Sequence, residues 1–393
     1  MRSGKSAGAG AALTTEMTRS MLLARSERVV DQMQREGFDA LIVVGRGAVG
    51  EYGFLEYLAG YSPFARSAYV VLSAGHSPVV VQPTAADCAL AARKTGLDVR
   101  VAGDGDIIGD HDGLASAVAK VIRELGHQDG RVGVVGLAHI LSVGAHRTLV
   151  NALPDATIED ATFIVANIKA IKSATELVNI RATMAIADEG MRVLVGHLRP
   201  GITGWELNGD IERAIRRRGA RYSLVFLSAA PYFIAAPSDR PFKSGDLVTA
   251  YVEVTGVDGY WVELARLFAI GELDDEAEQL AGACLAAAAD AEGLMVVEGP
   301  VTDVAAAIER RAETVAATSG IWHGHGVGID HDLPVVSHTA TERFHDGCVI
   351  SVHPNFRSAS GRYGASVADT YAIVSTGTSR LSSIPRELQR VPA

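Results

Sequence analysis

Histidines are concentrated toward the carboxyl end of the sequence. Six of the twelve histidines lie between His323 and His353, in a chain with a net charge of −10. The stretch HGHGVG, from His323 to Gly328, alternates histidine with glycine, which permits tight backbone geometry and close approach of a ligand. Imidazole can act as acid, base or metal ligand near neutral pH. On an extended segment His323 and His325 would place both rings on one face, as many metal sites require, although a glycine-rich turn would also explain the pattern.

Two glutamates form a second candidate group. Glu253 and Glu263 lie on two predicted strands joined by the turn Val257–Gly259, so they could face one another across a hairpin. Paired carboxylates of this kind can perform acid/base chemistry or hold a cation, but exposed cross-strand glutamates are also common. His353 lies in the apolar run CVISVHP, where a hydrogen-bonded core histidine is the plain alternative.

Alternating strands and helices precede these residues. Apolar spacing predicts strands over 38–45, 68–73, 78–82, 99–102 and 131–135, and helices over 17–37, 85–94, 114–125 and 141–153. Strands interleaved with helices are typical of an α/β domain, here over about residues 20–165.

A different pattern begins near residue 170. The sequences Ser173–Glu176 and Thr203–Glu206 are capping boxes, which predict helix starts. The first helix runs to about residue 198, and strands are expected over 246–255 and 260–270. The order then recurs, with helices over 274–294 and from 302, and strands over 348–354 and 367–374. Two helices followed by two strands, twice over, predict two similar halves of one α+β domain.

Composition restricts the function classes. The 393 residues are 48 % hydrophobic and 21 % charged, as in globular proteins. The acidic balance argues against nucleic acid as a partner, and no run of about 18 apolar residues predicts a membrane span. The three cysteines are far apart, which argues against a disulfide framework. We expect a cytoplasmic protein with a flexible lead-in over residues 1–16.

Five segments, in the same order, resemble motifs of the creatinase / prolidase / aminopeptidase P family. They are the linker IKAIKSATELVNIR (168–181), the hairpin SGDLV (244–248) with GYWVELAR (259–266), HGHGVGID (323–330), DGCVISVHPNF (346–356) and SVADTYAIV (366–374). The resemblance covers about residues 20–385. It implies an amino-terminal α/β domain over 17–168, followed by a pseudo-two-fold α+β domain of the "pita-bread" fold over 169–393.

The resemblance also identifies departures at the family's metal ligands. The family's peptidases hold two ions through two aspartates, one histidine and two glutamates. In this chain the corresponding positions are Tyr251 or Val252 (with Glu253 the nearest carboxylate), Glu263, His325, His353 and Ala368. A dinuclear centre needs several anionic ligands, so we expect none here. One catalytic histidine, expected near residues 234–236, is absent, and the other falls on Asp332, with His331 adjacent.

These departures favour the creatinase-like members of the family, which lack the metal pair. The leading hypothesis is an enzyme without a metal cofactor that acts on a small carboxylate-bearing substrate by histidine-centred acid/base chemistry, through C–N hydrolysis or elimination. The candidate catalytic residues are Glu263, His325, His353, His323 and His331. The candidate substrate-binding residues are Phe64, Arg66, Tyr260 and Arg266.

The segment Phe64–Arg66 resembles the F-x-R segment that creatinases extend into the neighbouring subunit's site. An arginine there could bind a substrate carboxylate through two hydrogen bonds. We therefore expect a homodimer with a composite active site and an interface of more than about 2,000 Å².

Two alternatives remain open. The first is an enzyme with one transition-metal ion, held by His325, His353 and Glu263 with Glu253 as a fourth ligand, since two imidazoles and a carboxylate suit such ions. The second is a catalytically inactive binding module of the same fold. Both enzyme hypotheses, without a metal and with one ion, predict that His325 and His353 lie close together. They also predict that Glu263 lies within hydrogen-bond or ligand distance of at least one of them.

Overall fold

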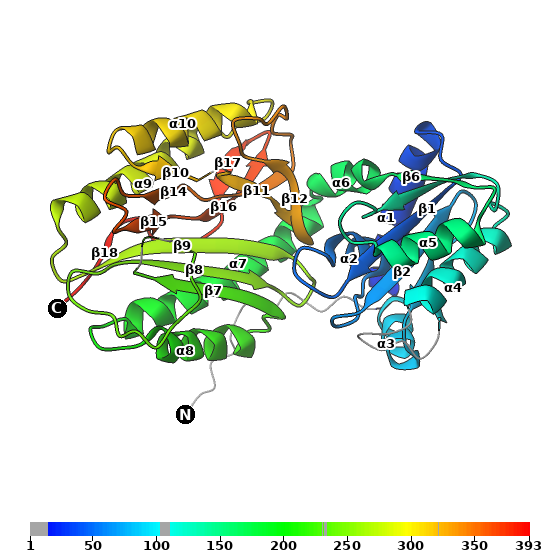
Figure 1. Cartoon of the computed structure of the whole chain (residues 1–393), viewed down its shortest axis with the longest axis horizontal. Coiled ribbons are helices and arrows are strands. Elements are labelled where there is room, and N and C mark those ends of the chain that lie inside the picture. Colours follow the sequence, from blue (N-terminus) through cyan, green and yellow to red (C-terminus); the bar gives the residue numbers. More distant parts are fainter. Residues whose placement is uncertain (1–14, 103–110, 230, 232–233, 321) are drawn as a thin grey trace. The chain divides into compact units, whose positions relative to one another are not determined.

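The structure is a computed structural model that describes residues 15–102, 111–229, 231, 234–320 and 322–393. Residues 1–14 of the expected lead-in lie outside the described residues, and the first helix already begins at Thr15. The chain divides into two compact units, Met1–Lys169 and Ala170–Ala393 (Figure 1). Among the described residues, no helix combines the length and the apolar character that crossing a bilayer requires.

The first unit is built on one six-stranded mixed sheet with the strand order β4-β3-β2-β1-β5-β6. Its strands are β1 (Ala40–Arg46), β2 (Ser67–Ser73), β3 (Val79–Gln82), β4 (Asp98–Val101), β5 (Arg131–Val135) and β6 (Thr157–Asp160). Its helices are α1 (Thr15–Arg35), α2 (Gly53–Ala59), α3 (Ala85–Thr95), α4 (His111–Glu124) and α5 (Val143–Ala152), and α6 (Thr162–Ala170) leads out of the unit.

The first unit forms because its central strand carries apolar residues on both faces of the sheet. Ala40, Ile42 and Val44 of β1 pack with residues of α4 and α5 in one core. The intervening residues, such as Leu41 and Val43, are also fully buried, so both faces of the central strand are covered. The sequence did not predict α2, β6 and α6; α2 has only seven residues, too few for helical periodicity to stand out.

In the second unit, each half has two helices and a sheet whose strands pair antiparallel, except that β18 pairs parallel with β9. The first half contains α7 (Ala174–His197), α8 (Gly204–Arg217), β7 (Tyr222–Ser228), β8 (Leu247–Thr255) and β9 (Trp261–Ile270). Both predicted capping boxes are present at the starts of α7 and α8. Strand β18 (Gln389–Val391) adds to β9, which gives the sheet order β18-β9-β8-β7.

The second half repeats this arrangement with α9 (Asp275–Leu294) and α10 (Val301–Glu313). Its five-stranded sheet has the order β12-β11-β13-β16-β17, and a small sheet has the order β10-β14-β15. These strands are β10 (Thr318–Ser319), β11 (Gly324–Gly328), β12 (Asp330–Val335), β13 (Cys348–Val352), β14 (Asn355–Arg357), β15 (Gly364–Ser366), β16 (Asp369–Val374) and β17 (Gly377–Arg380).

Within the second unit, the sheets lie between the helix pair α7–α8 and the helix pair α9–α10 (Figure 1). Main-chain bridges join Ala265 to Ala368 and Tyr260 to Ile329, so the inner faces of the two halves meet at β9. The predicted fold class is confirmed. The strand β11 was not predicted because its glycines disfavour strands; it forms by pairing with β12 and β13.

Candidate metal centre

Strand β9 positions the carboxylate of the site. All ten residues of β9 are buried, and Glu263 lies near its start with only 2 % of its surface exposed. Glu253 of β8 is its direct cross-strand partner, so the two glutamates oppose one another as the hairpin pattern suggested. The hydroxyl of Thr370 accepts from the Glu263 amide (3.1 Å) and donates to its carbonyl oxygen (3.0 Å), which fixes the backbone at this point.

Strands β11 and β13 position the two histidines. His325 of β11 pairs with Ser351 of β13, and His353 directly follows the end of β13. The glycines beside His325 allow neighbouring chain segments to come close. A Cβ atom at Gly324 would lie 2.4 Å from the Ser351 carbonyl oxygen, and one at Gly326 would lie 2.1 Å from the Leu333 carbonyl oxygen. The glycine-histidine alternation therefore serves close strand packing around His325.

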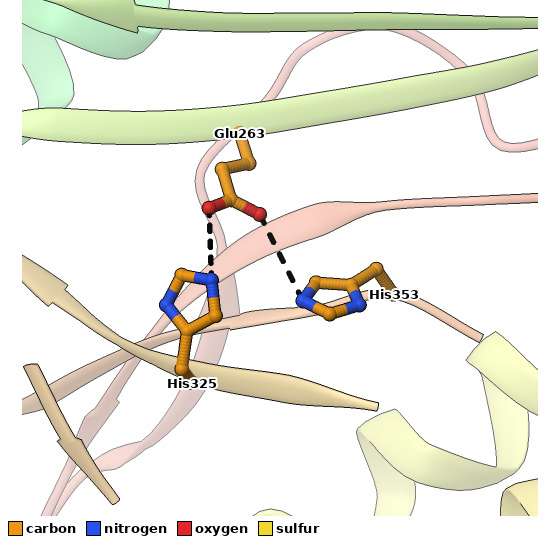
Figure 2. Close-up of side chains that lie close together, drawn as sticks. All are labelled: Glu263, His325 and His353. Atoms are coloured by element: carbon orange, nitrogen blue, oxygen red, sulfur yellow. Dashed lines mark ion pairs between the residues drawn. The ribbon is translucent and has the colours of Figure 1, made fainter. Parts of the chain in front are cut away.

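The three side chains converge from these elements on one point (Figure 2). The Nε2 atom of His325 lies 3.1 Å from Glu263 Oε1, and that of His353 lies 4.0 Å from Glu263 Oε2. One ligand atom from each of the three residues lies within 4.8 Å of the other two, and all three residues are buried. The structure thus brings together the two histidines and the glutamate that the motifs indicated.

Three side chains donate hydrogen bonds to the Glu263 carboxylate. Tyr251 and Ser351 donate hydroxyl hydrogen bonds to Oε2 (3.1 and 2.8 Å), and the Trp261 indole donates to Oε1 (3.2 Å). Burial opposes ionisation of this carboxyl, but the neighbouring His325 imidazole outweighs it and lowers the pKa of Glu263. Burial, together with the charge of Glu263, raises the pKa of Glu253 well above its ordinary value. Ionisation is therefore favoured at Glu263 and opposed at Glu253.

Hydrogen bonding determines which nitrogen of His325 faces the site. Its Nδ1 atom lies 3.0 Å from the Gly326 carbonyl oxygen, which can only accept, so Nδ1 carries the proton. In a neutral ring, Nε2 then presents a lone pair toward Glu263 Oε1. Two facing lone pairs are unfavourable unless a proton or a cation lies between them. Burial by itself would lower the pKa of His325, but the charge of Glu263 outweighs burial and raises it. For His353, burial dominates and lowers the pKa to about 4.

His331 joins the site at its more exposed side. Its ring lies 4.6 Å from that of His325, and its Nε2 lies 3.9 Å from Glu263 Oε1. The Asp330 carboxylate, 2.8 Å from Nδ1, orients the ring. Asp330 adopts a left-handed backbone (φ 68°) at the tight turn into β12, which aspartate tolerates better than most residues.

His323 does not join the site, which corrects the expectation that it acts with His325. The His323 backbone still pairs with Val336 and His353, but its side chain is not among the donors that converge. Its Nε2 atom instead faces Glu309 (3.7 Å) and Ser319 (3.3 Å).

Arg266 is also not available to a substrate, although a binding role was expected. Its side chain is fully buried and its five N–H donors are used: they bond the carbonyl oxygens of Ala265, Ala368, Ile384 and Pro385 and the carboxylate of Asp369. Tyr260 is buried and bridged to Ile329 through the main chain. Phe64 and Arg66 belong to the first unit, where Phe64 is 71 % exposed and Arg66 lies 3.8 Å from Asp87.

At the positions of the missing family ligands the structure is apolar. Tyr251, Ala265 and Ala368 form one small buried cluster, against which Phe226 packs. Glu253, expected as a fourth ligand, is not among the donor atoms that converge.

Sequence reasoning missed several residues of the site. Trp261 and Ser351 lie two positions before Glu263 and His353, so strand alternation places them on the same face as those residues. That alternation was the available signal. Trp322, whose ring lies 5.4 Å from His325 and 5.1 Å from His353, carried no such signal because it precedes the strand.

The chain is similar to known proteins over most of its length. It is 28 % identical to an uncharacterized hydrolase/peptidase of Sinorhizobium fredii over 94 % of this chain and 96 % of that protein. It is also 28 % identical to a probable dipeptidase PepE of Mycobacterium bovis over 84 % and 87 % of the two chains.

Solved structures have the same fold. The dipeptidase PepE of Mycobacterium ulcerans matches with a TM-score of 0.79 at 23 % identity, covering 95 % of this chain and 99 % of that chain. The X-Pro aminopeptidase of Thermotoga maritima matches with a TM-score of 0.80 at 18 % identity, covering 93 % and 99 %.

Two family models match the chain: the Creatinase/Prolidase N-terminal domain over residues 25–171, and Metallopeptidase family M24 over residues 178–375. The expectation of a metal-independent, creatinase-like enzyme without a cofactor is therefore wrong. The relatives named are peptidases, and three buried ligand residues converge where a metal ion could bind. The predicted resemblance to the creatinase / prolidase family is confirmed: the chain belongs to metallopeptidase family M24.

Proposed function

We propose that this protein is a metal-dependent hydrolase of amide bonds in short peptides or peptide-like molecules, with one transition-metal ion on Glu263, His325 and His353. The observation that carries the proposal is the convergence of these three buried donors. The names of the relatives, a hydrolase/peptidase and a probable dipeptidase, support the amide bond as the target.

The donor set fits such an ion. Two imidazoles and one carboxylate are the protein ligands of several catalytic zinc sites, and they also suit iron and manganese. With metal–ligand bonds of about 2.0–2.2 Å, tetrahedral donors lie about 3.3–3.6 Å apart. The distances from Glu263 to His325 (3.1 Å) and to His353 (4.0 Å) lie on either side of this spacing. A cation would also relieve the two lone pairs that face one another at His325 and Glu263.

The surroundings favour one ion over two. Ala368 and Tyr251 supply no carboxylate at two of the family's ligand positions, and with Ala265 they form an apolar cluster. Burial and the charge of Glu263 raise the pKa of Glu253, which opposes a second negative charge beside Glu263. A second divalent ion would therefore lack the anionic ligands that offset its charge.

A bound divalent ion would supply a polarised carbonyl and an activated water. The protein residues would divide the remaining work. Tyr251, Trp261 and Ser351 hold the Glu263 carboxylate in one orientation. Asp330 fixes the proton on Nδ1 of His331, which leaves Nε2 to take a proton from the attacking water and return it to the leaving amine.

We also propose a homodimer in which Arg66 binds an anionic group of the substrate in the neighbouring chain's site. The 71 % exposure of Phe64 supports an intermolecular role for this segment. Light scattering at micromolar concentration tests the dimer, and a monomer contradicts it. If the site is shared, mixing Arg66→Ala protein with His325→Ala protein restores part of the activity, because hybrid dimers contain one intact site.

Metal analysis of protein expressed without a histidine tag tests the main proposal. We expect about one transition-metal ion per chain by mass spectrometry, and hydrolysis of a dipeptide panel that a chelator abolishes. Two ions per chain, or none after incubation with Zn²⁺, Mn²⁺, Co²⁺ and Fe²⁺, would overturn it. A loaded protein without turnover on the panel would instead favour the binding-module hypothesis.

A further inference from the structure

We propose that Trp322 forms an aromatic wall beside the metal ligands and selects substrates with a flat apolar group next to the metal-binding atoms. The inference rests on the proposed function, because the wall is defined by its contact with the proposed ligands. It adds a specificity residue and a substrate class to that function.

The indole contacts both ligand imidazoles. Its ring centre lies 5.4 Å from that of His325, tilted by 39°, and 5.1 Å from that of His353, edge to face at 85°. Both distances fall within the range in which aromatic side chains attract one another. Trp322 therefore packs against both of the proposed ligand histidines.

Trp322 is the open member of this group. It is 43 % exposed, whereas Glu263, His325 and His353 are between 2 % and 6 % exposed. A large apolar side chain held open beside buried polar donors has the composition of a ligand site, in which a few polar groups orient the ligand and apolar surface binds the rest. A flat apolar group of the ligand would cover this indole and remove apolar surface from water.

The backbone of Trp322 is linked to the backbone of the ligand residue His353. The buried amide of Asn355 donates to the carbonyl oxygens of Trp322 (3.3 Å) and His353 (2.9 Å), which ties the two backbones together. Gly320 packs so closely on Asn355 that a Cβ atom would lie 1.8 Å from its Oδ1 atom. This packing holds Trp322 in place, and a fixed surface costs less entropy on binding than a mobile one.

The charge of the site favours an uncharged group on this wall. A divalent cation held by two imidazoles and one carboxylate carries a net positive charge. An ammonium group would be repelled by that charge at short range, which opposes the attraction of a cation to an indole. An aromatic or branched apolar residue beside the scissile carbonyl carries no charge and can also cover the indole.

Binding of two small hydroxamates tests the proposal without relying on turnover. Acetohydroxamate and benzohydroxamate present the same metal-binding oxygens, and only the second carries a flat ring. We expect Co²⁺-loaded wild-type protein to bind benzohydroxamate at least about tenfold more tightly by calorimetry. Trp322→Ala should reduce the preference to less than about threefold, and Trp322→Phe should retain most of it.

Trp205→Ala is the matched control, because Trp205 is also exposed (63 %) but lies on α8 and bonds the Pro237 carbonyl oxygen. It should leave the preference unchanged. An equal preference in Trp322→Ala and wild-type protein, at equal cobalt content, overturns the role of Trp322 and leaves the proposed function intact. A wild-type protein that takes up no metal overturns both.

Discussion

Two buried charged clusters lie three residues apart on strand β9 and differ in how their polar atoms are used. Around Arg266, the guanidinium donates five hydrogen bonds to four carbonyl oxygens and to Asp369, which Arg380 and Arg386 also approach at 3.7 and 3.6 Å. Around Glu263, the Nε2 atoms of His325 and His353 face the carboxylate at 3.1 and 4.0 Å. Both clusters are buried to a similar degree.

The difference shows that buried charge alone does not identify a functional site. The Arg266 guanidinium uses all five of its N–H donors within the chain, so it has none to offer a ligand. The Glu263 cluster has donor atoms that converge on one point and an orientation of His325 that calls for a proton or a cation. We therefore assign a structural role to the first and a ligand-binding role to the second.

The largest expected effect is on stability, at Arg266. Replacing Arg266 with methionine removes the centre of a buried network and leaves Asp369 with the more distant Arg380 and Arg386. We expect the free energy of unfolding to fall by about 3–5 kcal/mol in urea titrations. Arg390→Met, which breaks the exposed pair with Glu278, should cost less than about 1 kcal/mol. A loss at Arg266 as small as at Arg390 would remove the contrast between the clusters.

The second prediction concerns the ligand histidines. His325→Ala and His353→Ala should each empty the site of metal and lower turnover about 10²-fold or more, and the double variant should be little worse, because the residues act as one unit. Metal content and kcat are the measurements. His338→Ala, in the same histidine-rich stretch but 66 % exposed, is the control. Single variants that retain full metal and full turnover would make the Glu263 cluster structural as well.

His331 should separate catalysis from metal binding. Because it lies beside the cluster but outside the converging donors, His331→Ala should retain about one ion per chain and lower kcat by about 10²-fold. Asp330→Asn should have a smaller effect in the same direction, since it only orients the ring. Loss of metal in His331→Ala would show instead that this histidine is a ligand.

The smallest effect is a pH dependence of the metal-free protein. The Glu263 carboxylate raises the pKa of His325 in the folded state above 6.5, so this pair contributes stability that is fully present below pH 6.5. That stability is lost as the pH rises through the folded-state pKa. The difference in unfolding free energy between wild type and His325→Ala should therefore shrink above pH 6.5. His353, with a pKa of about 4, titrates below this window and does not contribute to the change. A difference that grows with pH would contradict the assigned orientation of His325.

Local patterns in the sequence were sufficient for much of the fold. Capping boxes and helical spacing predicted α7 and α8, and strand runs predicted β8, β9, β13 and β16, because these signals act between residues a few positions apart. Strand β11 was not predicted, since its glycines become a strand only when β12 and β13 pair with it. The motif order identified Glu263, His325 and His353 as one site although β9, β11 and β13 are far apart in the chain.

By itself the sequence determined the family, the two-half architecture and the three residues that converge. It did not determine which neighbours complete the site, because those contacts depend on side-chain direction and on pairing between distant segments. Only the tertiary structure turned His323 away to Glu309, brought His331 and Trp322 to the ligands, and enclosed Arg266 among carbonyl oxygens. The hydrogen bond from His325 Nδ1 to the Gly326 carbonyl oxygen turns Nε2 toward the Glu263 carboxylate, and this is a property of geometry that residue identity alone does not carry.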